Sequence, residues 1–145
     1  MPFEVLKFRT MTVRRTADEG LQATPSDPRV TRVGWFLRRT SLDELPQLIN
    51  VLRGDMSLVG PRPHLAEHDN RFAAMVATYP QRHQVKPGLT GLAQVRGYRG
   101  ETRTRCCVEG RVAADLAYVG NWSLSLDAKI IAQTFGAVLT GRNAY

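Results

Sequence analysis

One stretch in the first half of the chain, TSLDELPQLINVLRGDMSLVGPRP at residues 40–63, limits the possible folds more than any other part. Four apolar residues in it recur at the i, i+3, i+4, i+7 spacing of an amphipathic helix: Leu45, Leu48, Ile49 and Leu52. Gly54 stands where a helix commonly ends in a left-handed residue. The pattern therefore predicts a short helix whose apolar stripe faces the core.

Pro46 limits where this helix can begin, because proline lacks an N–H and fits only the first helical turn. We expect the regular helix to start near residues 43–45, which places Asp43 and Glu44 at its positive end. Negative charge is favoured there, as a nucleophile or metal ligand requires. Ser41 and Glu44 also fit the capping box S-x-x-E, in which they would only close the helix end. These residues alone leave both interpretations open.

A stiff turn that carries an arginine follows, at the end of the run GDMSLVGPRP. Prolines on both sides of Arg62 restrict its backbone. A guanidinium fork matches phosphate oxygens in a bidentate way, and a fork that is held rigid loses less entropy on binding. The turn therefore indicates a pre-positioned anion-binding group close to the two carboxylates.

Composition narrows the class of partner. The chain has 145 residues, a length for one domain, and a net charge of +7, which favours nucleic acid, phosphorylated small molecules or an acidic membrane surface. Cys106 and Cys107 are too few and too close for a disulfide framework, so we expect helix-packing thiols in a reducing, cytosolic setting. No apolar run approaches the roughly 20 residues that span a bilayer, which predicts a soluble or peripheral chain.

The remaining patterns predict an α+β fold, mostly helical, with a few short strands. We expect a strand at residues 2–12, a loop at 13–28, helices at 29–39, 64–79 and 102–119, and a turn leading into a strand at 85–95. A last helix, capped by Ser123 or Ser125 and ended by Gly141, has a wide apolar face: Ile130, Ile131, Thr134, Phe135, Val138 and Leu139. This face favours core packing, with a lipid headgroup layer as the alternative.

Two other functions have a motif in the sequence. Arginines interleaved with aromatic residues at 29–39 are typical of single-strand nucleic-acid binding, but no known binding module accompanies them. His64, Glu67 and His68 match the zinc motif H-x-x-E-H, but no third ligand can be named. A polar helix surface explains the second motif more simply.

The run LRRTSLDELPQLINVLRGDMSLVGPRP, residues 37–63, closely resembles the signature of the bacterial sugar transferases. These are polyprenyl-phosphate glycosyl-1-phosphate transferases, which begin exopolysaccharide, O-antigen or glycan assembly. Their other motifs follow in the family's order, namely LKFRTM, DPRVTRVGWFLRRTSLDELPQ, VKPGLTGLAQV and DLAYVGNWSLSLDAKII. Family members carry a membrane-inserted helix ahead of the first motif. We therefore expect residues 1–145 to be a single catalytic domain without that anchor.

The resemblance implies transfer of a sugar 1-phosphate from a UDP-sugar to a membrane polyprenyl (undecaprenyl) phosphate, at the cytoplasmic face of the bacterial inner membrane. It implies that Asp43 is the nucleophile of a phospho-aspartyl intermediate and that Glu44 binds Mg²⁺, which would also relieve repulsion between adjacent carboxylates. The residues implied in phosphate or substrate binding are Arg9, Arg38, Arg62, Lys86 and Gln94.

Overall fold

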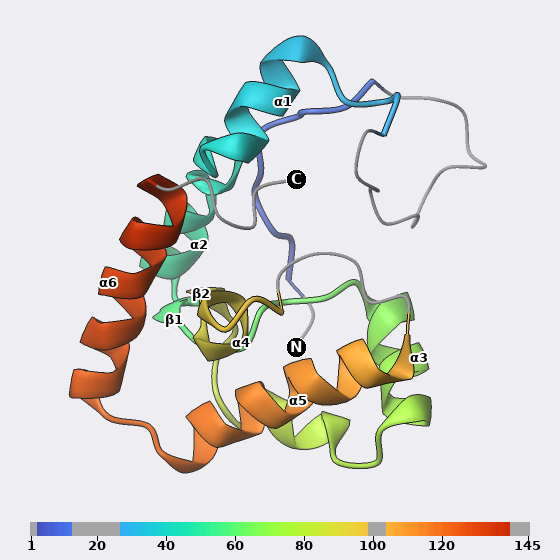
Figure 1. Cartoon of the computed structure of the whole chain (residues 1–145), viewed down its shortest axis with the longest axis vertical. Helices are drawn as coiled ribbons and strands as arrows, with labels where there is room; N and C mark the ends of the chain where they lie inside the picture. Colours follow the sequence, from blue (N-terminus) through green and yellow to red (C-terminus); the bar gives the residue numbers. More distant parts are fainter. Residues whose placement is uncertain (1–2, 13–26, 99–103, 140–145) are drawn as a thin grey trace.

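The structure, a computed structural model, describes residues 3–12, 27–98 and 104–139. Its elements are, in order, α1 (Arg32–Arg39), the 3₁₀ turn η2 (Leu42–Glu44), α2 (Gln47–Arg53), β1 (Ser57–Val59), α3 (Ala66–Met75), the 3₁₀ helix η3 (Tyr79–Gln84), β2 (Gly88–Thr90), α4 (Leu92–Val95), α5 (Arg105–Gly120) and α6 (Leu124–Leu139). The predicted α+β class with mostly helical content is confirmed. Figure 1 shows α1 at one end of the long axis and α3 and α5 at the other, with the strands between them.

The two strands pair in parallel, with Ser57 opposite Gly88 and Val59 opposite Thr90. Beyond the strand end, the Gly88 amide donates to the Pro61 carbonyl at 2.9 Å. The backbones approach so closely that a Cβ on Gly88 would lie 2.1 Å from the Gly60 nitrogen. A side chain cannot fit there. The backbone just before Arg62 is therefore tied to β2.

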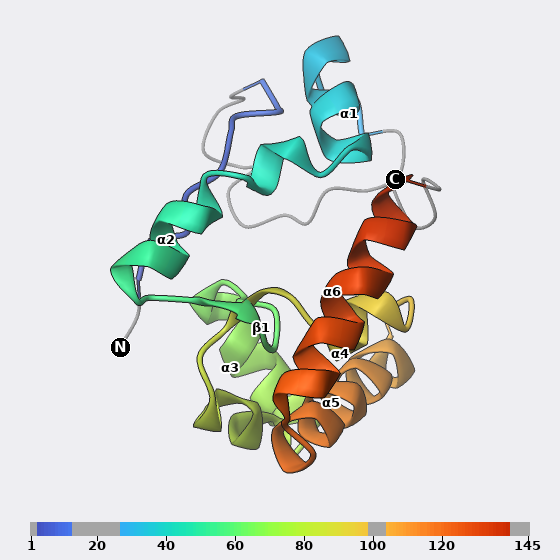
Figure 2. The same ribbon diagram turned by 90° about the vertical axis from the view of Figure 1, so that its left-hand side faces the viewer.

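Two apolar clusters hold the helices around this small sheet. One joins α3, η3 and α5 through Phe72, Tyr79, Val108 and Val112. The other joins β1, α5 and α6 through Val59, Tyr118 and Ile130. Figure 2, turned by 90°, shows α6 running along the molecule from the α5 end toward α1. The expectation that the last helix packs on the core is confirmed at Ile130, whereas Phe135 is 66% exposed.

The apolar stripe of α2 faces outward, which contradicts the sequence-based prediction. Leu45, Leu48 and Ile49 are each more than one-third exposed, and Leu52 is 87% exposed, while Gln47 and Asn50 are buried. The cause is that the N-terminal segment forms hydrogen bonds with the polar face of α2. The Asn50 side chain accepts from the Leu6 amide at 3.0 Å and donates to the Glu4 carbonyl at 2.8 Å. The N-terminal segment thus covers the polar face of α2.

The start of α2 also differs from the prediction. Leu42–Glu44 form a 3₁₀ turn, Pro46 is the N-cap residue, and the α-helix begins only at Gln47. Ser41 has a left-handed backbone (φ 58°), and its side chain makes no capping hydrogen bond, so the capping-box interpretation is wrong. The predicted left-handed end at Gly54 (φ 83°) is confirmed.

Of the other predictions about helices, strands and cysteines, some are confirmed and some are wrong. The predicted strand at residues 2–12 is wrong, because only Met11 there forms an isolated antiparallel bridge, with Val30. The helices at 29–39 and 102–119 are confirmed as α1 and α5, and Ser123 caps α6 by accepting from the Leu126 amide. The helix at 64–79 is shorter than predicted. Both cysteines are exposed, which contradicts their expected packing. Gly141 and most of the loop at 13–28 lie outside the described residues.

Candidate active site

Asp43 and Glu44 lie side by side in η2, the short turn between α1 and α2. Their exposed fractions are only 2% and 7%. Burial of two adjacent carboxylates is costly unless opposite charges and hydrogen bonds compensate. Two cations from distant parts of the sequence, Lys7 and Arg62, provide this compensation.

Lys7 contacts both carboxylates from the N-terminal segment. Its Nζ lies 2.9 Å from Asp43 Oδ2 and 3.3 Å from Glu44 Oε1. The contact with Asp43 is an ion pair without hydrogen-bond alignment. The segment has no regular structure at this point, yet it is fixed, because the Phe8 amide donates to the Asp43 carbonyl at 2.9 Å. The bonds from Asn50 fix the same segment further along α2.

Arg62 contacts Glu44 through both nitrogens at the end of its guanidinium. Its Nη1 donates to Glu44 Oε2 at 3.1 Å, and its Nη2 donates to Glu44 Oε1. This is the bidentate geometry in which a guanidinium binds a carboxylate most strongly. The Pro-Arg-Pro turn therefore holds Arg62 against one of the paired carboxylates, and its role in phosphate binding stays a prediction.

The formal charges within this group cancel, since two carboxylates face one ammonium and one guanidinium. Lys7 and Arg62 therefore already relieve the repulsion between the adjacent carboxylates. That repulsion alone does not require a metal ion. Mg²⁺ binding stays a prediction that rests on the oxygen donors of Asp43 and Glu44.

The other predicted substrate-binding residues are more widely spread. Arg9 is exposed on the N-terminal segment, and Arg38 lies half-buried in the last turn of α1. Lys86 is exposed, with its Nζ close to the backbone of Gly54. Gln94, in α4, donates to the carbonyl of Leu89 in β2 at 3.4 Å. Their roles in binding stay predictions.

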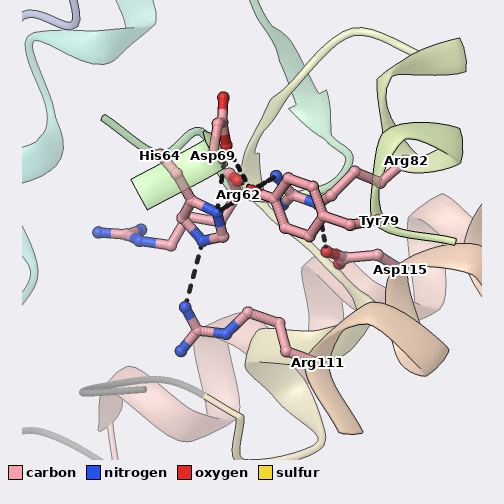
Figure 3. Close-up of polar contacts among 7 residues, drawn as sticks. All are labelled: Arg62, His64, Asp69, Tyr79, Arg82, Arg111 and Asp115. Atoms are coloured by element: carbon pink, nitrogen blue, oxygen red, sulfur yellow. Dashed lines mark hydrogen bonds and ion pairs between the residues drawn. The ribbon is translucent and has the colours of Figure 1, made fainter. Parts of the chain in front are cut away.

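A buried polar cluster lies behind the Pro-Arg-Pro turn and connects it to α3, η3 and α5 (Figure 3). Arg82 is 3% exposed and donates from Nε to Asp115 Oδ2 at 2.9 Å. Its Nη2 donates to the Arg62 carbonyl at 2.5 Å. Burial raises the pKa of Asp115, and the neighbouring Arg82 opposes that rise.

His64 is the neutral member of this cluster. Tyr79 donates its hydroxyl hydrogen to Asp69, so His64 Nδ1 is the donor in its 2.7 Å bond with Tyr79. The other ring nitrogen, Nε2, then accepts from Arg111 at 3.2 Å (Figure 3). Burial, followed by the charges of Arg82 and Arg111, lowers the pKa of His64 to about 2.

This arrangement leaves the zinc motif without support. The lone pair of the His64 ring already accepts a hydrogen bond from Arg111. Across residues 3–12, 27–98 and 104–139, no three His, Cys, Asp or Glu side chains gather where they could hold a metal ion. The simpler interpretation of the motif as helix surface also fails for His64, which lies before α3 with only 7% of its side chain exposed.

Sequence reasoning missed three charged residues around the site. On the N-terminal segment the resemblance implies Arg9 rather than Lys7, and no sequence pattern indicates Arg82 or Asp115. Lys7 and Arg9 are two residues apart on an extended segment without regular alternation. Their spacing therefore does not indicate which of the two cations faces inward. The buried pair gave no local signal, because its partners lie on separate elements.

None of the helices within the described ranges is long and apolar enough to cross a membrane. The structure instead presents a helical domain with a compact group of two carboxylates and two cations. The chain matches the bacterial sugar transferase family across residues 1–141 and belongs to that family. The resemblance seen in the sequence motifs is thereby confirmed.

Similar proteins are known from several bacteria. Over 99% of its length, the chain is 55% identical to a UDP-glucose:undecaprenyl-phosphate glucose-1-phosphate transferase of Caulobacter vibrioides and 51% identical to the protein of that name in Escherichia coli. It covers 54% and 31% of those two proteins. It is also 47% identical to an exopolysaccharide production protein of Rhizobium leguminosarum, with 94% of the chain and 69% of that protein matched.

Proposed function

We propose that this chain is the catalytic region of an enzyme that transfers a sugar 1-phosphate from a UDP-sugar to a polyprenyl phosphate. The observation that carries the proposal is the group formed by Asp43, Glu44, Lys7 and Arg62. It combines a buried carboxylate nucleophile with cations that can stabilise a transferring phosphoryl group. Two of the relatives that match 99% of the chain are named for this reaction with UDP-glucose and undecaprenyl phosphate.

The proposed reaction has two steps at one phosphorus atom. An Asp43 carboxylate oxygen attacks the sugar-linked phosphorus, the bond from that phosphorus to the UMP oxygen breaks, and UMP leaves. The product is an acyl phosphate that carries the sugar. A polyprenyl phosphate oxygen then attacks the same phosphorus, the bond to Asp43 breaks, and the free carboxylate returns.

The cations have distinct roles in this proposal. The guanidinium fork of Arg62 matches phosphoryl oxygens, and it binds the Glu44 carboxylate in the resting arrangement. Lys7 lies directly against Asp43 Oδ2, so its ammonium must shift or share contacts before that oxygen attacks. Both cations then face the charge that develops on the phosphoryl group.

We propose Mg²⁺ as the cofactor, held by Glu44. The donor set fits, because Mg²⁺ prefers one or two carboxylates together with phosphate oxygens and water. When bound, the ion would neutralise diphosphate charge and polarise the phosphoryl oxygens. Any cation at Glu44 competes with Lys7 and Arg62 for the same two oxygens.

The proposal is tested by incubating the full chain with a panel of UDP-sugars, undecaprenyl phosphate and Mg²⁺, and measuring UMP release. We expect release with at least one UDP-sugar, with UDP-glucose as the first to try. A brief incubation without acceptor should leave labelled sugar phosphate attached to the protein. UMP release without any trapped label would contradict the covalent intermediate, and absence of UMP for every sugar would contradict the function.

A further inference from the structure

The Pro-Arg-Pro turn presents a problem of positioning. Pro61 and Pro63 have no N–H, so the turn cannot be held through those two amides, whereas its carbonyls can accept hydrogen bonds. The Pro61 carbonyl accepts from the Gly88 amide at 2.9 Å. The next carbonyl, that of Arg62, accepts from Arg82 at 2.5 Å. Two successive carbonyls are therefore fixed from different elements.

Arg82 is well suited to fix such a carbonyl. Its guanidinium is planar, and each of its three nitrogens has a separate partner in the cluster. Nε donates to Asp115, Nη1 to the Tyr79 hydroxyl at 3.3 Å, and Nη2 to the Arg62 carbonyl. Asp115 is 1% exposed and anchors the fork to α5. Figure 3 shows a dashed line from Arg82 to Asp115 next to the Tyr79 ring.

Stability alone is a weak explanation for this pair. Two charges lose their hydration when they are buried, and apolar residues of similar volume often leave a protein equally stable or more stable. The pair does provide something that apolar side chains cannot. It supplies a hydrogen bond, of fixed direction, to the backbone of the residue whose side chain binds Glu44.

We propose that Arg82 and Asp115 form a positioning pair, which holds the Arg62 carbonyl so that the Arg62 guanidinium stays aimed at Glu44 and at the phosphoryl group. This inference rests on the proposed function for the role of Arg62 toward substrate. Neither member of the pair touches the reacting atoms. Their effect on turnover passes entirely through Arg62.

The main test is the double variant Arg82→Met with Asp115→Leu, made in the full chain. We expect a melting temperature close to that of the parent, because both buried charges are removed together. We expect kcat for UMP release to fall about 100-fold, with a smaller change in KM, because misplacement by about 1 Å mainly affects the transition state. The matched control is Arg105→Gln with Glu109→Gln, which removes an exposed ion pair on α5, the helix that also carries Asp115. This control should leave the melting temperature and kcat unchanged.

A second comparison separates positioning from a merely structural role. In an Arg62→Ala background, removing the pair should lower kcat by less than about twofold, because residues that act as a unit are not additive. An equal loss with and without Arg62, or full activity of the double variant, would overturn the inference. If the double variant does not fold, Arg82→Lys takes its place. That variant keeps the charge and loses the fork, and unchanged kcat in it would also overturn the inference.

A readout without substrate keeps the inference independent of the proposed reaction. Nitrogen-15 NMR of arginine side chains reports how freely the Arg62 guanidinium rotates. We expect slow rotation in the parent and fast rotation in the variant without the pair. Slow rotation in both would overturn the positioning role, even if no UDP-sugar proves to be a substrate. Slow rotation that is lost with the pair supports the inference, whatever the outcome of the UMP assay.

Discussion

At the scale of single residues, Glu44 is the carboxylate that hydrogen-bonds to both cations of the site. It accepts from Lys7 through Oε1, and it accepts from Arg62 through both oxygens. A carboxylate that is shared in this way links the two cations to each other. Substitutions at Glu44 should therefore change both metal use and the placement of Arg62.

We expect Glu44→Gln to raise the Mg²⁺ concentration needed for half-maximal UMP release by about tenfold or more, because a neutral amide is a poor ligand for a hard cation. The melting temperature should change much less, since the amide oxygen can still accept from Arg62. The measurement is a Mg²⁺ titration of initial rates for parent and variant. Identical titration curves would place the metal elsewhere.

Asp43→Asn should abolish UMP release, with a loss of roughly three orders of magnitude or more, because the amide keeps the shape but is not a nucleophile. The fold should survive, since Lys7 keeps Glu44 as a partner. Rates are compared with circular dichroism spectra of the same samples. A variant with parental turnover would remove Asp43 from the mechanism.

Lys7 and Arg9 form a natural matched pair for substitution. Lys7→Ala should lower kcat about tenfold or more, because it removes a cation that lies 2.9 Å from Asp43. Arg9→Ala should have a smaller effect, since Lys7 rather than Arg9 makes the ion pair with Asp43. Steady-state UMP release at saturating UDP-sugar measures both. A larger loss for Arg9→Ala would restore the sequence-based choice of Arg9.

At the scale of elements, sequence patterns located helices better than they oriented them. The existence of α1, α5 and α6 follows from their caps and apolar periodicity. The orientation of α2 does not, because its stripe of leucines suggests a buried face while Asn50 binds the N-terminal segment instead. Asp43, Glu44 and Arg62 lie within one motif and could be predicted. Lys7, Arg82 and Asp115 could not, because contacts between distant segments leave no local periodicity.

The polar cluster that joins the turn after β1 to α3, η3 and α5 should make stability depend on pH. The pKa of His64 is lowered to about 2 from an ordinary value of 6.5, so only the unfolded chain takes up a proton between these values. The contribution of neutral His64 is complete above pH 6.5 and declines by about 1.4 kcal/mol for each pH unit below it.

The variant His64→Gln removes this titration while it keeps polar atoms in the cluster. Between pH 6.5 and pH 5, the free energy of unfolding of the parent should fall by up to about 2 kcal/mol more than that of the variant. Urea unfolding at both pH values provides the comparison. Equal decreases in parent and variant would show that His64 is protonated in the folded protein.

At the scale of the whole molecule, α1, α2 and α6 lie along the left-hand side in Figure 1, the side that faces the viewer in Figure 2. The same three helices carry large exposed apolar side chains: Val33, Trp35, Phe36, Leu48, Ile49, Leu52 and Phe135. Exposed arginines occur on the same helices, at Arg32, Arg39 and Arg53. Apolar side chains bordered by cations suit an anionic lipid surface, and we propose that this side contacts the membrane where the polyprenyl phosphate resides.

We expect Leu52→Glu to reduce binding to vesicles of anionic lipid by about tenfold or more, because it replaces an 87% exposed leucine with a charge of the wrong sign. Liposome flotation measures the bound fraction. The matched control is Leu65→Glu, at an exposed leucine just before α3, which should bind like the parent. Equal losses for both variants would show that net charge, rather than this side of the molecule, controls attachment.

The bond from Arg82 to the Arg62 carbonyl also has a consequence for the order in which the protein is made. Asp43 and Glu44 leave the ribosome before Asp115, which belongs to α5 and anchors Arg82. β2, which holds Pro61, is also translated after the turn that it supports. A nascent chain therefore carries the paired carboxylates before the arginine beside them has been fixed. The proposed chemistry becomes available only when the second half of the chain has folded onto the first.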